Sequence, residues 1–120
     1  MFQLSLCKNQ LLRMYGVCRL HNLQELHLAY NGILTIEGLK ELQHLSHLNL
    51  EGNNIKAIEH LNTNIKLEYL NLSENSIGII SDISYLKCLK VRIDWFASFR
   101  FIPTLDPMHS FTFFLNRKHF

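Results

Sequence analysis

The chain has 120 residues, of which 48% are hydrophobic and 18% charged, and its formal net charge is +2. This length suits one domain, and so small a net charge argues against nucleic acid or an anionic membrane as the main partner. No apolar run approaches the roughly 18 residues that a membrane span needs. We also see no signal peptide. Three cysteines without a Cys-x-x-Cys pair favour neither a disulfide framework nor a zinc site, so we expect a reducing, cytoplasmic setting.

Short strands are predicted at four evenly spaced places, where two leucines alternate with a polar residue. Alternation places the leucines on one face and the residues between them on the other. Strands that recur in the same direction pair in parallel, and no single repeat can bury its own apolar face. We therefore predict a stack of repeats with one continuous core. The leucine pairs are Leu4 and Leu6, Leu26 and Leu28, Leu48 and Leu50, and Leu70 and Leu72.

An asparagine follows each leucine pair at the same position of the repeat: Asn9, Asn31, Asn53 and Asn75. The chain must turn inward after each strand, where backbone groups have no sheet partner and still require hydrogen bonds. An asparagine amide both donates and accepts. We therefore predict a structural asparagine ladder that joins each turn to its neighbour.

The second half of each repeat carries apolar residues three apart, which indicates a short helical turn, often of the 3₁₀ type. The first of these positions is apolar in every copy: Met14, Ile36, Ile58 and Ile80. The third position holds Leu20, Leu42 and Leu86, but Asn64 interrupts it in the third copy. Asn64 indicates either a local polar bulge or a weak repeat.

Together these positions form the leucine-rich-repeat signature, because the step from Leu4 to Leu26, Leu48 and Leu70 is constant and falls within the range of this repeat class, roughly 20–29 residues. The signature predicts an α/β solenoid with short parallel strands on the concave face and 3₁₀ or short helical turns on the convex face. Such a fold offers a surface rather than a catalytic pocket. We therefore predict a protein–protein interaction module that is not an enzyme and needs no cofactor.

The polar strand positions are the candidates for binding a partner. Tyr69 is the aromatic anchor, because tyrosine is enriched in interface hot spots, and Tyr30 lies near the edge. A convex or terminal site is the alternative. The predicted partner-binding residues are Gln3, Glu25, His27, Tyr30, His47, Asn49, Glu51, Tyr69 and Asn71.

Metal binding and catalysis find little support in the sequence. His44 and His47 lie three residues apart, and His27 is placed diagonally from His47. No cysteine or carboxylate completes a tetrahedral set with them, so we expect no metal site. Cys7 has no evident histidine and acid that would activate it as a nucleophile. We therefore expect no catalytic residues.

The repeat template is lost after residue 90, because Arg92 and Asp94 stand where a fifth copy on the same frame requires apolar residues. We therefore predict four repeats over residues 1–90 and a non-repeat, aromatic-rich tail over residues 91–120. The tail holds seven of the eight phenylalanines and the tryptophan. Two interpretations stay open: a partial cap on the last repeat, or a disordered segment.

The residues between the leucines resemble one family in particular. Residues 14–17 (Met-Tyr-Gly-Val), 36–42 (Ile-Glu-Gly-Leu-Lys-Glu-Leu) and 48–57 look like the amino-terminal repeats of the ninety-seven-kilodalton centrosomal protein family, whose members carry leucine-rich repeats and an IQ motif. The resemblance implies a scaffold at centrosomes and centrioles, which restrains cilium assembly together with a centriole-capping protein. This chain has no IQ motif, so we expect no calmodulin site.

Other functions remain open at this point. Repeats of the same length also resemble the leucine-rich regulatory subunits of phosphatases. An RNA-processing adaptor has similar repeats, although the weak net charge argues against direct contact with RNA. A truncated isoform without independent function is the last alternative.

Overall fold

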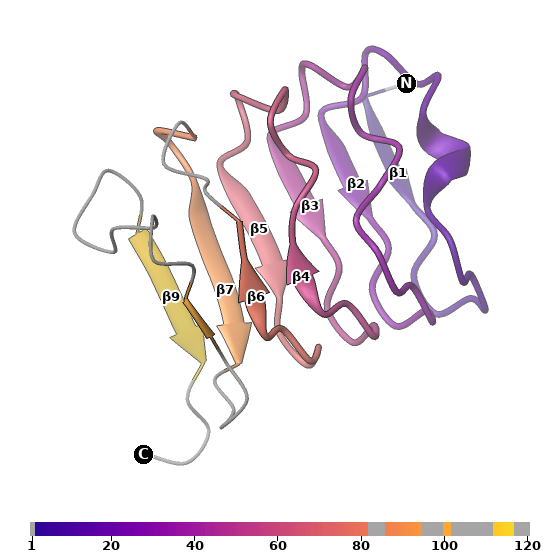
Figure 1. The fold of residues 1–120 in the computed structure, drawn as a ribbon. Helices are drawn as coiled ribbons and strands as arrows, with labels where there is room; N and C mark the ends of the chain where they lie inside the picture. Colours follow the sequence, from indigo (N-terminus) through magenta and orange to yellow (C-terminus); the bar gives the residue numbers. More distant parts are fainter. Residues whose placement is uncertain (1, 82–85, 95–99, 102–111, 117–120) are drawn as a thin grey trace.

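Successive turns of the chain stack side by side in a computed structural model, which describes residues 2–81, 86–94, 100–101 and 112–116 (Figure 1). One short strand from each turn joins a parallel sheet, and the strands follow one another in chain order. This arrangement is the predicted solenoid. The strands of this sheet are β1 (Gln3–Ser5), β2 (Glu25–His27), β3 (His47–Asn49), β5 (Tyr69–Leu72), β7 (Lys90–Asp94) and β9 (Thr112–Asn116).

The register of the sheet aligns the leucines of successive repeats. Leu26 pairs with Leu48, and Leu48 pairs with Leu70, so that each side chain stacks on its equivalent one repeat away. All three are at most 1% exposed, as the alternation predicts. Burial of a side chain of this size contributes on the order of 1.5–3 kcal/mol. This continuous leucine column is what joins the repeats.

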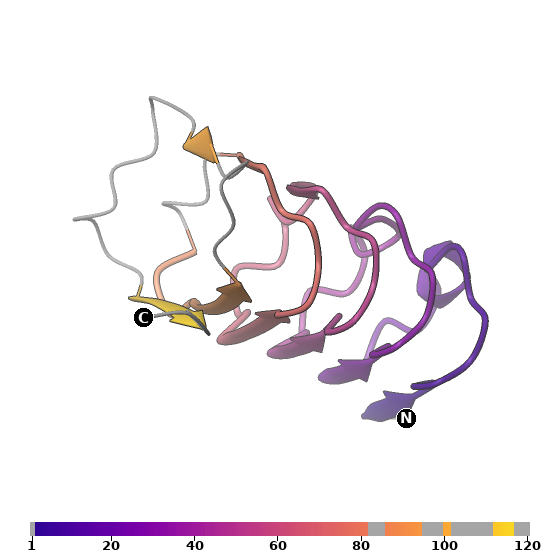
Figure 2. The ribbon, with the colours of Figure 1, turned by 90° about the horizontal axis from the view of Figure 1, so that it is seen from below.

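The return segments lie on the other side of the stack from the sheet (Figure 2). The predicted helical turn occurs as the 3₁₀ helix η1 (Tyr15–Val17) in the first repeat. Later repeats place short extended segments on this side, where β4 (Ala57–Ile58), β6 (Ile79–Ile80) and β8 (Arg100–Phe101) form a second parallel sheet. Isoleucine favours an extended backbone because its branched Cβ restricts the side chain. Ile58 and Ile80 lie in β4 and β6, at the position of the repeat that Met14 holds just before η1.

The four asparagines form a ladder of hydrogen bonds between repeats. Asn53 donates from Nδ2 to the carbonyl oxygens of Leu28 and Leu50, both at 3.0 Å, and its Oδ1 accepts the N–H of Ile33 at 3.0 Å. Asn75 repeats this pattern one turn later, and Asn31 does so one turn earlier. Asn9 donates to the carbonyl oxygen of its own turn. Each rung therefore satisfies backbone groups that the sheet leaves without partners.

Asn64 is fully buried at the position that leucine occupies in other repeats. Its Nδ2 donates to the carbonyl oxygens of Leu39 and Leu42 at 2.9 and 3.1 Å, so the side chain bonds the preceding repeat. Its Oδ1 has no hydrogen-bond partner among the described residues. Asn64 is therefore a half-satisfied contact between repeats rather than a bulge.

The sequence analysis ends the repeats at residue 90, whereas parallel strands continue beyond it in the structure. β7 pairs with β5, and β9 pairs with β7. The reason is a shorter repeat: the constant step from Leu26 to Leu48 and Leu70 leads next to Arg92, but Leu70 pairs with Val91, one position earlier. The frame that required apolar residues at Arg92 and Asp94 is therefore off by one. Residues 95–99, 102–111 and 117–120 of the predicted tail lie outside the described residues.

No helix in the described part of the chain is long and apolar enough to span a membrane.

Candidate protein-binding face

The side of the six-stranded sheet that points away from the core is the concave face of this fold class, and it carries most of the predicted partner-binding residues. The first column of this face pairs Gln3 with Glu25, Glu25 with His47, and His47 with Tyr69. The second column holds Ser5, His27, Asn49 and Asn71 in the same way. Glu51 and Tyr30 follow their strands and lie at the edge of the face. The register thus brings the predicted set together, with Tyr30 and Glu51 at its border.

An aromatic stack occupies the later repeats of the first column. The rings of His47 and Tyr69 have centroids 4.9 Å apart and planes that differ by 24°. The ammonium of Lys90 lies over the Tyr69 ring, 5.8 Å from its centroid. A cation over a tyrosine ring is attracted by the negative face of the ring. Tyr69 is nevertheless 48% exposed, so the stack presents an ordered aromatic surface to solvent.

Lys90 was not among the predicted binding residues, because the fixed repeat frame placed it outside the face. In the structure it begins β7 and pairs with Tyr69. It also lines a shallow depression together with Glu68, Tyr69 and Cys88. A frame shortened by one residue is the signal that would have assigned Lys90 to the first column.

Asn49 and Asn71 have defined amide orientations in the second column. The Oδ1 of Asn49 accepts the backbone N–H of Glu51 at 3.1 Å, and the Oδ1 of Asn71 accepts that of Ser73 at 3.0 Å. Since the oxygen must face the backbone donor, the NH₂ group of each amide faces away from it. Neither NH₂ group has a hydrogen-bond partner among the described residues.

The charged and histidine side chains of the face have contacts with neighbouring side chains. His27 Nε2 lies 3.2 Å from Glu25 Oε1, so this carboxylate already has a partner on the face. His47 Nδ1 lies 2.8 Å from the hydroxyl oxygen of Ser46. Within the described residues no group of three or more His, Cys, Asp or Glu side chains could hold a metal ion. The histidines thus contribute polar contacts at separate places on the sheet.

The side chain of Tyr30 is fixed by contacts with other residues of this chain. Its hydroxyl donates to Glu74 Oε2 at 2.8 Å, although the two residues belong to repeats that are not neighbours. The ring crosses Gly52, where an added Cβ would lie 2.4 Å from a ring carbon. Gly52 also has a φ of +71°, which suits glycine. Tyr30, Gly52 and Glu74 therefore form one strap along three repeats.

The strap changes the acidity of the tyrosine. The hydrogen bond to Glu74, together with burial and the charge of Glu51, raises the pKa of Tyr30 to about 12. The sequence analysis placed Tyr30 near the edge as a second aromatic contact, and missed Gly52 and Glu74. Their signal was present, because Tyr30, Gly52 and Glu74 occupy one position of the repeat.

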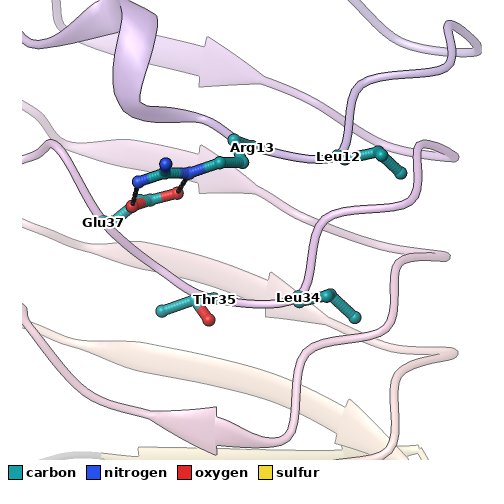
Figure 3. A pocket seen from close by; sticks show the side chains of 5 residues that line it. All are labelled: Leu12, Arg13, Leu34, Thr35 and Glu37. Carbon is teal, nitrogen blue, oxygen red and sulfur yellow. Dashed lines mark hydrogen bonds and ion pairs between the residues drawn. The ribbon is translucent and has the colours of Figure 1, made fainter.

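A second surface lies on the return segments of the first two repeats. Figure 3 shows a shallow depression lined by Leu12, Arg13, Leu34, Thr35 and Glu37. Arg13 donates two hydrogen bonds to Glu37, from Nε to Oε2 at 3.0 Å and from Nη2 to Oε1 at 2.6 Å. This contact lowers the pKa of Glu37 and raises that of Arg13. Leu12 and Leu34 are 67% and 57% exposed. The charged groups beside them, Arg13 and Glu37, are already paired with each other.

The stacked parallel strands, the buried leucines and the asparagine ladder define a leucine-rich-repeat solenoid, a class of fold that serves as a protein-interaction module. Models of known repeat families match the sequence of this chain. The model described as "Leucine Rich repeats (2 copies)" matches residues 21–63, and the model "Leucine Rich Repeat" matches residues 66–87. Residues 21–87 are therefore almost entirely leucine-rich repeats.

A solved structure shows the same fold. An internalin, InlF, from Listeria monocytogenes is 26% identical with a TM-score of 0.66, and the match covers 78% of this chain and 27% of that chain. The functional domain of InlJ from the same organism is 22% identical with a TM-score of 0.46, and the match covers 81% of this chain and 26% of that one. The chain thus spans about a quarter of either structure. No curated protein matches it.

Proposed function

We propose that this chain binds a protein partner on its concave face, through the residues that the strands present there. The observation that carries this proposal is the stack of His47, Tyr69 and Lys90 on a sheet whose opposite side is a continuous leucine core. Such a core holds the strands rigid, so the exposed side chains lose little freedom when a partner binds. The proposed binding residues are Gln3, Glu25, His27, His47, Asn49, Glu51, Tyr69 and Asn71, with Tyr30 at the edge.

The partner and the setting follow from the family resemblance of the sequence. Residues 36–42 and 48–57 support a scaffold of the centrosome and centriole, located in the cytoplasm. In this role the chain binds a centriole-capping protein and helps to restrain cilium assembly. The repeats supply the binding surface for that role.

Expression in ciliated cells tests both parts of the proposal. We expect the tagged chain to enrich at centrosomes and to co-isolate the centriole-capping protein. Tyr69→Ala should weaken binding by at least about thirtyfold and reduce the co-isolated amount, because an aromatic hot spot typically contributes about 2 kcal/mol or more. Tyr15→Ala is the matched control, since Tyr15 is also exposed but lies on η1, across the stack from the sheet.

Two results would contradict the proposal separately. A chain that folds but never enriches at centrosomes contradicts the centrosomal role. Equal loss of partner with Tyr69→Ala and Tyr15→Ala contradicts the concave face as the binding site. Thermal unfolding of both variants, followed by circular dichroism, establishes that each variant is folded.

A further inference from the structure

We propose that the later half of the concave face binds an extended acidic segment of the partner, an inference that rests on the proposed function and specifies its ligand. The surface consists of His47, Asn49, Tyr69, Asn71 and Lys90, and we name it the donor surface. Carboxylates of the segment contact the Lys90 ammonium and the two asparagine amides.

The first argument is the direction of the hydrogen-bonding groups. Asn49 and Asn71 turn their oxygens to backbone N–H groups, so the groups that face a partner are their N–H donors. The two residues are direct neighbours in the parallel register, which places them about 4.8 Å apart. A row of donors at this spacing selects a ligand rich in acceptors. Carboxylates are the strongest acceptors among side chains.

The second argument is charge. Lys90 contacts the Tyr69 ring, but its ammonium forms no ion pair within the part of the chain that the structure describes. Of the acidic residues of the face, Glu25 lies one repeat before the donor surface, whereas Glu51 follows Asn49 in the same repeat. The Lys90 ammonium is therefore available to a carboxylate of a partner, beside the two amides.

The third argument concerns shape. Parallel strands present a flat row of alternate side chains, and an extended peptide presents its own side chains on alternate sides. Tyr69 is 48% exposed and held between His47 and Lys90, so it offers an ordered ring against which an aliphatic or aromatic residue of the segment packs. Glu68 lines the depression at the start of the strands. A carboxylate of the segment that contacts Lys90 is therefore expected to bind away from Glu68, which would repel it.

A polyanion such as RNA would also find donors here. The same face carries Glu25 and Glu51, however, and the whole chain has a net charge of only +2. A phosphate backbone carries a charge at every nucleotide and would be repelled by these carboxylates, whereas a peptide can place its carboxylates opposite the donors alone. The observations therefore favour a peptide.

Fluorescence anisotropy with the full chain tests the inference. The probe is a labelled twelve-residue peptide that alternates glutamate with valine, and the comparison peptide has glutamine for each glutamate. We expect the glutamate peptide to bind at least about tenfold more tightly, because hydrogen bonds to a charged group are about twice as strong as neutral ones. A labelled single-stranded RNA of similar length serves as the second probe.

Asn71→Asp is the decisive variant. An aspartate still accepts the N–H of Ser73, but it replaces the outward donor with an acceptor, so the fold is retained and the glutamate peptide should bind at least about tenfold more weakly. Asn62→Asp is the matched control, because Asn62 is exposed on the return side and the charge change is the same. Lys90→Gln should weaken binding about threefold to tenfold.

Each outcome decides the inference. Selective binding of the glutamate peptide that Asn71→Asp removes and Asn62→Asp retains supports it. Equal binding of both peptides, no binding of either, or tighter binding of the RNA overturns it. The proposed function is judged separately: if Tyr69→Ala still reduces co-isolation of the partner while Tyr15→Ala does not, the concave face binds it through other chemistry.

Discussion

At the scale of single residues, two buried asparagines contribute differently because their partners differ. The N–H of Ile33 is buried and bonds only to Oδ1 of Asn53, so the fold depends on this side chain to satisfy it. The carbonyl oxygens that Asn64 contacts also accept backbone N–H groups, from Leu42 and Leu45. Removing Asn64 therefore leaves no group unsatisfied, whereas removing Asn53 leaves one.

The first stability prediction compares these two positions with the same substitution. Asn53→Leu should lower the free energy of unfolding by about 1–3 kcal/mol, the cost of a buried donor without a partner. Asn64→Leu should change it by less than about 1 kcal/mol. The substitution removes two hydrogen bonds, but it also removes a buried oxygen that has no partner, and these two effects offset each other. Urea denaturation followed by circular dichroism measures both. Equal losses would show that the partners of the two side chains do not decide their contributions.

The second prediction concerns the strap of Tyr30 and Glu74. Because the pKa of Tyr30 is raised to about 12, the strap contributes its full stabilisation of the fold at pH values below the ordinary tyrosine pKa of about 10. Its contribution is lost as the pH rises towards 12. An ultraviolet titration of tyrosinate should contain one late component that Tyr30→Phe removes.

Tyr15→Phe provides the control for this titration, because the Tyr15 ring packs under Arg13 and does not belong to the strap. The late component should remain in that variant. It should shift towards the ordinary value in Glu74→Gln, where the neutral amide no longer opposes ionisation. A titration that is the same in Tyr30→Phe and in the unmodified chain would rule out the strap.

At the scale of elements, the sequence predicts well wherever two periodicities agree. Leucine alternation and the constant repeat frame both indicate β2, β3 and β5, and the asparagines at the ends of these strands form the ladder that the unpaired backbone requires. The same frame placed Glu25, His47 and Tyr69 in one column of the face. Backbone register follows from spacing alone, which is why these residues could be placed.

Elements that depend on a change of spacing or on contacts between repeats were harder to predict. β7 required a shortened repeat, which a fixed frame cannot detect. The strap of Tyr30 required Gly52 to make room for a ring from the preceding repeat. The second sheet required Ile58 to pair with Ile80 of the next repeat, whereas Ile36 at the same position lies in no strand. In each case packing against a neighbouring repeat decided between local conformations.

At the scale of the whole molecule, stability is shared between neighbours. β5 pairs with β3 on one side and β7 on the other, and no strand among the described residues pairs with one further away. In such a stack each repeat stabilises the next, so the free energy of unfolding is a sum of repeat and interface contributions. Removing β7, β8 and β9 leaves one side of β5 and of β6 without a partner strand. Unpaired edges of this kind also favour association between copies.

Comparison of residues 1–120 with residues 1–89 tests this view. We expect the shorter chain to unfold at a lower temperature by at least about 4–8 °C, the shift that about 1 kcal/mol produces in a small domain. Size-exclusion chromatography should show association, because the edge of β5 is then open. Thermal unfolding at two protein concentrations separates lost stability from association. Equal unfolding temperatures and a monomeric shorter chain would mean that the strands after residue 89 add nothing to the solenoid, and that its first four repeats stand alone.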